Sequence, residues 1–287
     1  MSEIKTIGVV GAGTMGNGIA QLAAQMGANV IMRDVKDDFV QRGIKAIDKF
    51  LQKGVERGKV TEDQKSSVLG RIIGTTDMGE LAKADFIIEA VIEDLDLKKQ
   101  VFSQLDEICR PEVILATNTS SMSVTLIAAA TKRQDRVVGM HFFNPVPLMK
   151  LVEIIRGFGT SDQSVAVTSA LAQKMGKETV EVKVDSPGFI VNRLMIPHMI
   201  EAVKLLEEGV ATKEDIDKAI KLGLNYPMGP FELMDFTGID ICKYVADYFY
   251  LELNKEQKWS VPTVMKNQVR SGFVGRKSGK GWYDYGK

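Results

Sequence analysis

The first 34 residues constrain the fold more than any other part of this 287-residue chain. An apolar, β-prone run at residues 4–10 leads directly into GAGTMG at residues 11–16, and a helical pattern then continues to about Met26. A second β-prone run follows and ends in Asp34. A lone GxGxxG is weak evidence, but here it opens a helix directly after a strand, and an acid ends the next strand. The context favours a dinucleotide-binding βαβ unit over a glycine turn in another α/β protein.

Each part of this motif has a separate physical task. The first glycine permits a tight turn, the second lets the backbone approach a pyrophosphate, and the third allows the helix to pack closely on the strand. The N–H groups of the helix N-terminus are available to phosphates. The acid at the end of the second strand would bind the adenosine ribose and repel a 2′-phosphate, which predicts NAD; the neighbouring Arg33 and Lys36 leave NADP open. The expected cofactor-binding residues of the motif are Gly11, Gly13, Thr14, Met15, Gly16 and Asp34.

Alternating strand and helix signals continue along the chain. β-prone runs occur at residues 71–74, 85–91 and 113–116, and helical patterns separate them, notably at residues 95–108. This alternation is typical of an α/β protein with a parallel sheet between two helical layers, here a Rossmann-type doubly wound sheet. Ser186-Pro187-Gly188 marks a boundary, after which the chain is mostly helical. We therefore expect a nucleotide-binding domain at residues 1–187 and an all-α domain at residues 188–287.

Residues 37–69 are too many for an ordinary connection inside such a fold. Apolar residues recur at helical spacing in the first half, and Thr61 with Gln64 has the form of a capping box for a second helix. We expect an inserted helical pair. Its basic residues, among them Lys53 and Arg57, could hold a phosphorylated substrate tail or form an ordinary solvated helix face.

Charge and cysteine content exclude several classes of function. Lys plus Arg equals Asp plus Glu at 37 each, so general binding to nucleic acid or to an anionic membrane has no electrostatic basis. The cysteines, Cys109 and Cys242, form no CxxC pair and suit a reducing compartment. The uncharged stretch between Lys5 and Arg33 is interrupted by glycines, asparagine and glutamines, so it is no membrane span. A cytoplasmic location is expected.

One of the two histidines, His141, stands just after a short apolar, β-prone run. Glu153 follows twelve positions later, inside the apolar run LVEII, where an unpaired carboxylate would be costly to bury. Pro145 and Pro147 between them favour an extended or turning path. Two strands joined by a turn could bring the imidazole and the carboxylate together. In the alternative interpretation, His141 is a hydrogen-bonded core histidine and Glu153 points into solvent from the outer face of its strand.

Polar residues also follow two of the expected parallel strands. Glu93 and Lys98 come after one strand, and NTSS at residues 118–121 comes after the next. Ligands of doubly wound sheets bind at the carboxyl ends of the strands, so these side chains are expected near the site.

Taken together, these segments resemble the L-3-hydroxyacyl-CoA dehydrogenase family, most closely its bacterial 3-hydroxybutyryl-CoA dehydrogenases, over nearly the whole chain. The motifs that carry the resemblance are GAGTMG with Asp34, NTSS, HFFNPVPLMKLVEI, DSPGFIVNR, YPMGPFELMD and GRKSGKGWY. The resemblance implies hydride transfer between NAD(P) and a short-chain acyl-CoA, interconverting (S)-3-hydroxybutyryl-CoA and acetoacetyl-CoA. It also implies a homodimer, or a higher homo-oligomer, built by the helical domain.

The resemblance further implies roles for individual residues. His141 would be the general acid/base and Glu153 its orienting partner, while Ser120 and Asn192 would position the substrate. The inserted helical pair would face coenzyme A, which brings Lys53 and Arg57 into consideration as substrate contacts. The residues expected to approach NAD outside the glycine motif are Glu93, Lys98, Ser120, Asn144 and Lys277.

Two other functions compete with this interpretation. A β-hydroxyacid dehydrogenase of similar architecture would act on a free carboxylate and use lysine as its acid/base, whereas this chain offers a His–Glu pair. A non-catalytic, NAD-binding structural relative would not need His141, Glu153, Ser120 and Asn192, all of which are present.

Overall fold

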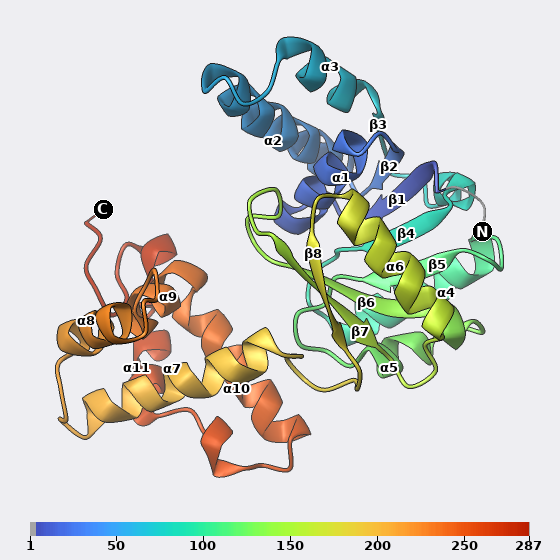
Figure 1. Cartoon of the computed structure of the whole chain (residues 1–287). Helices are drawn as coiled ribbons and strands as arrows, with labels where there is room; N and C mark the ends of the chain where they lie inside the picture. The colour runs from blue at the N-terminus through green and yellow to red at the C-terminus, as the bar shows by residue number, and fades with distance from the viewer. Residues whose placement is uncertain (1–3, 287) are drawn as a thin grey trace. The chain divides into compact units, whose positions relative to one another are not determined.

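The computed structural model describes residues 4–286 and divides into two compact units, Met1–Ser186 and Pro187–Lys287. Figure 1 shows the elements of both units along the chain. The strands, all in the first unit, are β1 (Thr6–Val10), β2 (Asn29–Arg33), β3 (Ile72–Thr75), β4 (Phe86–Glu89), β5 (Ile114–Thr117), β6 (Val137–Phe142), β7 (Leu151–Arg156) and β8 (Glu178–Val182). The α-helices of this unit are α1 (Thr14–Gln25), α2 (Asp37–Glu56), α3 (Glu62–Gly70), α4 (Leu95–Ile108), α5 (Val124–Ala128) and α6 (Asp162–Lys174).

The eight strands form one sheet in the order β3-β2-β1-β4-β5-β6-β7-β8. Every neighbouring pair is parallel except β6 and β7, which are antiparallel. The strand order reverses between β1 and β4, and this switch point is where doubly wound sheets bind dinucleotides. The predicted fold class, a Rossmann-type sheet followed by a helical unit, is confirmed.

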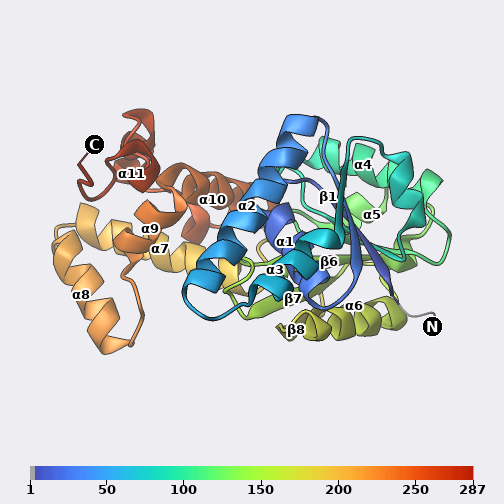
Figure 2. The same ribbon diagram turned by 90° about the horizontal axis from the view of Figure 1, so that it is seen from above.

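Helices cover both faces of the sheet. Figure 2 shows α4 and α5 on one side of the strands and α6 on the other. Central parallel strands are buried on both faces, which explains why β1, β4 and β5 are continuous apolar runs. The core on the α6 side also includes α1 and α2; its members include Ile7, Val9, Ile19, Ala23, Val40, Ile47, Phe86, Ile88, Val138, Met140, Val165 and Leu171.

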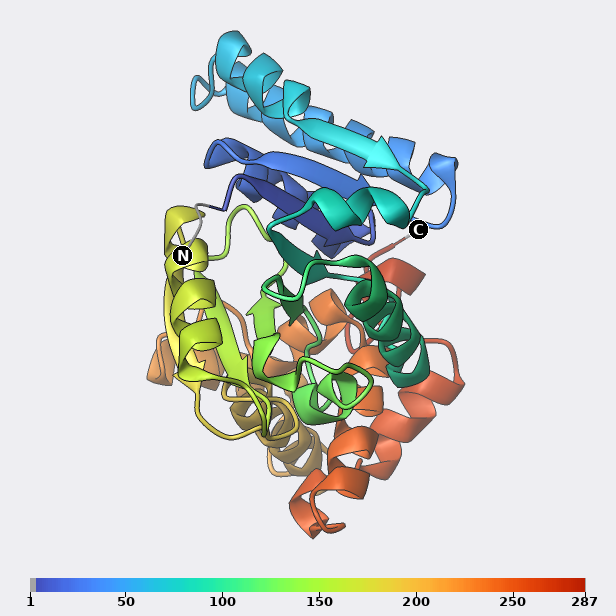
Figure 3. The same cartoon turned by 90° about the vertical axis from the view of Figure 1, so that its right-hand side faces the viewer.

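The helical pair α2 and α3 lies beside the β3 edge of the sheet (Figure 3). Val40, Ile47 and Leu51 are buried at helical spacing, as the sequence pattern predicts. The predicted capping box is present at the start of α3, where the Thr61 hydroxyl accepts from the backbone N–H of Gln64 and the Gln64 side chain accepts from that of Thr61. These two helices fill the segment between β2 and β3.

The second unit contains α7 (Val191–Glu207), α8 (Lys213–Gly223), α9 (Pro230–Thr237), α10 (Ile239–Glu252) and α11 (Thr263–Arg270). Aromatic pairs form part of its core: Phe231 meets Trp282 edge-on at 5.0 Å, and Phe249 meets Trp259 at 5.2 Å. The last residues pack back onto this unit. The Trp282 ring is buried, and the buried Asp235 carboxylate accepts from the backbone N–H groups of Trp282 and Tyr283.

Two expectations for this unit are wrong. The sequence suggests one apolar helix from about residue 230 to 251, but Gly238 adopts φ = 105° and divides it into α9 and α10. A helix is also expected to start soon after Pro187, yet α7 begins only at Val191. Gly188 and Phe189 both have positive φ, at 76° and 55°, and a right-handed helix cannot include that conformation. Among the described residues, no helix is long and apolar enough to cross a membrane.

Candidate active site

The glycine motif forms a tight passage from β1 into α1. Gly11 has φ = 106°, and a Cβ at this position would lie 2.5 Å from the Ala90 carbonyl oxygen. A Cβ on Gly16 would lie 1.8 Å from the Gly11 carbonyl oxygen, so only glycine allows the helix to pass this close to the turn. By contrast, a Cβ on Gly13 would have no neighbour within 4 Å among the described residues. Gly13 therefore leaves room for a ligand to reach the backbone.

Asp34 is held against this turn by backbone donors. One carboxylate oxygen accepts from the Ala12 N–H at 2.7 Å, and the other accepts from the Val35 N–H at 2.7 Å. The side chain remains partly exposed. It is therefore fixed in orientation and can still accept from a ribose hydroxyl.

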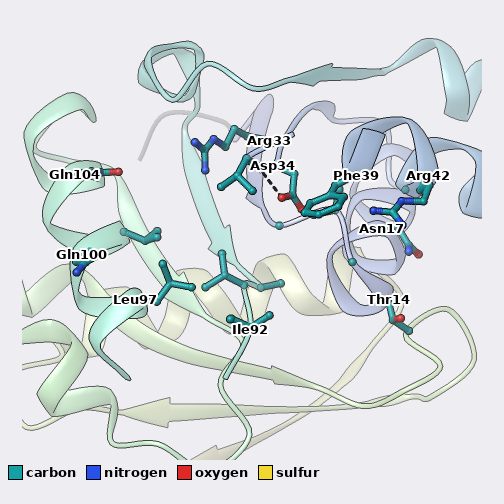
Figure 4. Close-up of a pocket in the computed structure, with 18 residues that line it drawn as sticks. Thr14, Asn17, Arg33, Asp34, Phe39, Arg42, Ile92, Leu97, Gln100 and Gln104 are labelled. Carbon is teal, nitrogen blue, oxygen red and sulfur yellow. Dashed lines mark hydrogen bonds between the residues drawn. The ribbon is translucent and has the colours of Figure 1, made fainter. Parts of the chain in front are cut away.

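A cavity of about 730 Å³ opens beside Asp34 (Figure 4). Residues of the glycine motif and of the segment after β4 line it, together with α2 and α4. Its lining residues are Gly11, Ala12, Gly13, Thr14, Asn17, Arg33, Asp34, Val35, Phe39, Arg42, Gly43, Ala90, Val91, Ile92, Leu97, Gln100, Val101 and Gln104. The mixture of apolar walls, glycine backbone and one anchored carboxylate suits an adenosine with its diphosphate.

Basic residues lie around Asp34, and two of them, Arg33 and Arg42, line the same cavity. The Arg33 guanidinium donates to the Thr76 carbonyl at 3.2 Å. Arg42 lies over the Phe39 ring, 4.6 Å from its centroid, and Lys36 lies 5.8 Å from the same centroid. Figure 4 shows Phe39 and Arg42 on the Asp34 side of the cavity. This arrangement retains the negative charge of Asp34 where a 2′-phosphate would approach.

The structure brings His141 and Glu153 together. They are register partners in the antiparallel pair β6–β7, and Nδ1 of the imidazole lies 2.7 Å from a Glu153 carboxylate oxygen. The Glu153 side chain is fully buried and the His141 side chain is 6% exposed. The contact uses Nδ1, so the acceptor carboxylate sets the tautomer of the imidazole. The Phe143 ring packs at 4.4 Å from the imidazole.

Asn118 and Lys177 hold the segment around this pair. The Asn118 side chain accepts from the backbone N–H of Phe142, the residue after the histidine. The Lys177 ammonium donates to the carbonyls of Val146 and Met149, both at 2.6 Å, and is itself buried. The connection from β6 to β7, which includes the exposed Asn144, is thereby tied to the start of β8.

Lys98 lies at the centre of a buried ionic network at the carboxyl ends of β4 and β5. Its ammonium contacts Glu89 at 2.7 Å and Glu93 at 3.3 Å. Burial lowers the pKa of Lys98, but the two carboxylates outweigh it and hold the pKa above its usual value. Burial likewise raises the pKa of Glu93, yet the Lys98 charge and hydrogen bonds from Thr119 and Ser120 bring it below the usual value. Both groups are therefore charged at neutral pH.

Ser120 is fixed through this network. Its backbone N–H and its hydroxyl both donate to one Glu93 oxygen, at 2.8 and 3.1 Å. Lys98 is only 1% exposed and engages two carboxylates, so its contacts in the structure are with protein groups. The predicted residues after β4 and β5 thus form one connected group.

The remaining predicted residues lie elsewhere in the chain. Asn192 is in the first turn of α7 and is half-buried. Lys277 lies in a short 3₁₀ segment (Arg276–Ser278), where its ammonium pairs with Asp240 at 2.7 Å. Lys53 and Arg57 lie at the end of α2 and are exposed. Asn192 and Lys277 thus belong to the second unit, and Lys53 and Arg57 to the inserted helical pair of the first.

Sequence reasoning missed several residues that shape this region, including Glu89, Thr117 and Lys177. Glu89 carried a readable signal, because it is a carboxylate inside the apolar run FIIEAV, as Glu153 is inside LVEII. Lys177 carried none, because a lysine after a helix is normally exposed. Phe39 and Arg42 were hidden within an ordinary amphipathic helix pattern.

Comparisons with known proteins agree with this geometry. A family model described as "3-hydroxyacyl-CoA dehydrogenase, NAD binding domain" matches residues 6–185, and one described as "3-hydroxyacyl-CoA dehydrogenase, C-terminal domain" matches residues 188–285. The chain is 47% identical over 283 residues to a probable 3-hydroxybutyryl-CoA dehydrogenase of Bacillus subtilis, covering 99% of this chain and 98% of the relative. It is 44% identical to a 3-hydroxybutyryl-CoA dehydrogenase of Clostridioides difficile, covering 98% and 99%. The crystal structure of (S)-3-hydroxybutyryl-CoA dehydrogenase from Ralstonia eutropha is similar with a TM-score of 0.96 and 46% identity, covering 99% of this chain and all of that one.

Proposed function

The chain belongs to the 3-hydroxyacyl-CoA dehydrogenase family and is an NAD-dependent oxidoreductase, and we propose that it interconverts (S)-3-hydroxybutyryl-CoA and acetoacetyl-CoA. The observation that carries the chemical part of this proposal is the buried contact between His141 Nδ1 and Glu153. A histidine held in one tautomer by a carboxylate is well suited to a reversible proton transfer to an alcohol oxygen.

The residues of the glycine turn fit a dinucleotide. Gly13 leaves its backbone open, the N–H groups at the start of α1 have no side-chain cap among the described residues, and Asp34 is oriented by two backbone donors. In our proposal the α1 N-terminus binds the pyrophosphate and Asp34 binds the adenosine ribose. When bound, NAD supplies the hydride acceptor, and NADH the donor.

The protein residues then have distinct tasks. In the oxidative direction, His141 Nε2 removes the proton from the 3-hydroxyl group as hydride leaves the carbon that carries this hydroxyl. Glu153 stabilises the imidazolium that forms and keeps the ring in place. In the reductive direction the imidazolium returns the proton to the developing alkoxide. Ser120, positioned by Glu93, and Asn192 are proposed to orient the substrate oxygens.

A direct assay tests this proposal. The purified chain is expected to oxidise NADH when acetoacetyl-CoA is added and to be inactive with free acetoacetate. His141→Gln should abolish turnover, whereas His198→Gln, a change to the only other histidine, should leave it close to that of the unaltered protein. Turnover of the free acid would support a β-hydroxyacid dehydrogenase instead, and NADH binding without turnover would support a non-catalytic relative.

The oligomer and the location are further parts of the proposal. The second unit exposes large apolar side chains, including Leu194, Leu222, Leu224 and Tyr226, which favours a homodimer formed through this unit. Both cysteines are free and buried, which fits a reducing, cytoplasmic environment. Sedimentation of the purified protein and fractionation of cells test these two points.

A further inference from the structure

Four side chains at the carboxyl ends of β4 and β5 form a charge cluster: Glu89, Glu93, Lys98 and Thr117. Glu89 and Lys98 are almost fully buried, with side-chain exposures of 0% and 1%. The contacts that join these four side chains measure between 2.7 and 3.3 Å. Lys98 meets Glu89 at 2.7 Å and Glu93 at 3.3 Å, and the Thr117 hydroxyl donates to Glu89 at 2.7 Å.

The cluster holds two carboxylates and one cation. The first oxygen of Glu89 accepts from the Lys98 ammonium and the Val91 N–H, and the second accepts from the Thr117 hydroxyl. Both oxygens of Glu89 therefore act as acceptors. Glu93 also accepts from hydroxyl and backbone donors, at Thr119 and Ser120. Two carboxylates and one ammonium group leave the cluster one formal negative charge in excess. Glu89 and Lys98 lie where water screens little, while the Glu93 side chain is 29% exposed.

The position of this charge relative to the cofactor follows from the sheet. Asp34, at the end of β2, marks the adenosine side of the cavity. A dinucleotide bound at the β1/β4 switch point extends from that side across the glycine turn toward the ends of β4, β5 and β6. Glu89 is the last residue of β4, and the next two residues, Ala90 and Val91, line the cavity. The cluster therefore lies on the side of the switch point toward which the nicotinamide half extends.

We propose that the excess negative charge of this cluster makes the protein bind the cationic, oxidised nicotinamide of NAD⁺ in preference to the neutral one of NADH, and that Glu89 is the positioning residue that supplies it. The inference rests on the proposed function, since it requires NAD to occupy the cavity. The charges of the two cofactor forms differ only at the nicotinamide ring. A fixed charge near that ring therefore changes the ratio of the two affinities, while a purely structural change lowers both alike.

The test is the ratio of dissociation constants, Kd for NADH divided by Kd for NAD⁺, measured by fluorescence titration and calorimetry. Glu89→Gln removes one negative charge and keeps the shape, and its amide can still meet the Lys98 ammonium, the Val91 N–H and the Thr117 hydroxyl. Lys98 retains Glu93, so no buried charge is left unpaired. The ratio is expected to fall by about 3- to 10-fold, as one unit charge at intermediate effective dielectric would produce.

Three matched variants separate charge from structure. Thr117→Val deletes a hydrogen bond of the cluster without changing its charge, so the two affinities should fall together and the ratio should hold. Glu89→Gln/Lys98→Gln removes one charge of each sign, leaves the net charge at its original value, and should return the ratio to within about 2-fold of the unaltered protein. Glu93→Gln removes the same unit of charge from the other carboxylate while Lys98 retains Glu89, and it should lower the ratio as Glu89→Gln does; it also serves as the test if Glu89→Gln does not fold.

The outcomes distinguish this inference from the proposed function. If the unaltered protein binds neither form of the cofactor, the proposed function fails and the inference fails with it. If both forms bind but the ratio is not above one in the unaltered protein, or if it stays constant in Glu89→Gln and Glu93→Gln, only the inference is overturned. The same holds if Thr117→Val changes the ratio as much as Glu89→Gln does, because the effect would then be structural.

Discussion

At the scale of single residues, the His141–Glu153 contact makes a quantitative prediction. The imidazole acts only in the orientation that the carboxylate fixes, so loss of either residue removes the same step. We expect His141→Ala to lower kcat by roughly 10²–10⁴-fold. Glu153→Gln keeps the shape but removes the charge that stabilises the imidazolium, so it should lose most of kcat as well.

The double variant is the decisive measurement for this pair. Its kcat with acetoacetyl-CoA and NADH should be hardly lower than that of His141→Ala alone. NAD affinity should change little in all three variants, because the glycine turn and Asp34 lie on other strands. If the fold-reductions in kcat of the two single variants multiply in the double variant, His141 and Glu153 act independently. Near-normal turnover in His141→Ala would mean that another residue is the acid/base.

Asp34 makes a second residue-level prediction, on the choice between NAD and NADP. Its carboxylate is fixed by the N–H groups of Ala12 and Val35, and Arg33 is engaged with Thr76. A 2′-phosphate would therefore meet a negative charge. We expect a higher kcat/KM with NADH than with NADPH, and Asp34→Ser should narrow the difference by about 10-fold or more. A preference of the unaltered protein for NADPH would mean that the basic residues Arg33, Lys36 or Arg42 dominate.

Residue-level prediction from the sequence succeeded where one local signal was enough. A carboxylate in an apolar strand pointed to Glu153 because a histidine stood nearby, and the structure places the two in contact. Glu89 gave the same signal, but its cation, Lys98, follows on the next helix, and only the fold shows that the two meet. Lys177 could not be found at all, because its acceptors are backbone carbonyls, which no sequence pattern reveals.

At the scale of elements, the passage from β1 to α1 depends on two glycines for opposite reasons. Gly16→Ala would place a methyl group 1.8 Å from the Gly11 carbonyl oxygen, so strand and helix must separate. We expect the free energy of unfolding of the first unit to fall by about 1–3 kcal/mol, the usual cost of overpacking. NAD affinity should fall with it.

Gly13→Ala is the matched control. The residue has φ = −66° and extended ψ, which alanine adopts without strain, and its Cβ would meet nothing within 4 Å among the described residues. Stability should therefore stay within about 0.5 kcal/mol of the original value. Only NAD affinity should drop, because the methyl group would occupy the approach of the pyrophosphate. Equal destabilisation by both substitutions in chemical denaturation would contradict this account.

The connection between β6 and β7 makes a second element-level prediction. Lys177, between α6 and β8, binds the carbonyls of Val146 and Met149 in this connection, and Val146 packs directly on α1 at Gly18. Lys177→Met would leave buried carbonyls unsatisfied and cost about 1–3 kcal/mol of stability. It should also weaken NAD binding by loosening the segment that begins at Asn144. Lys174→Met, at an exposed position of the same helix end, should change neither property.

Elements were predicted well wherever periodicity and caps agreed, as in α4 and in the capped start of α3. The helical pair in residues 37–69 was recognised because its apolar spacing is regular. The break between α9 and α10 was missed because a single glycine inside an apolar run carries no marker of its conformation. A Cβ at Gly238 would lie 2.8 Å from the Asp240 carboxylate and 3.1 Å from the Lys277 ammonium, and Lys277 is distant in sequence.

At the scale of the whole molecule, the apolar surface of the second unit remains to be explained. Leu194 on α7 is 70% exposed and Leu222 at the end of α8 is 76% exposed. Tyr226 follows α8 and lies with its ring 6.0 Å from that of His198, so the residues after α8 lie beside α7. Large exposed aliphatic side chains concentrated on neighbouring elements usually mark a protein interface. In the proposed homodimer, a second copy of the chain would cover these side chains.

We therefore expect Leu222→Lys/Leu224→Lys to convert a dimer into a monomer. Each of the two lysine ammonium groups would lose its hydration in an apolar interface without gaining an ion-pair partner. The free-energy cost of this desolvation exceeds the favourable free energy of a typical contact in the dimer. Sedimentation velocity over a range of concentrations measures the result. The control is Phe158→Lys, which makes the same kind of change at a residue that is 95% exposed in the first unit, and it should leave the dimer intact. A double variant that still sediments as a dimer would move the interface away from the end of α8, and a monomeric unaltered protein would remove the need for one.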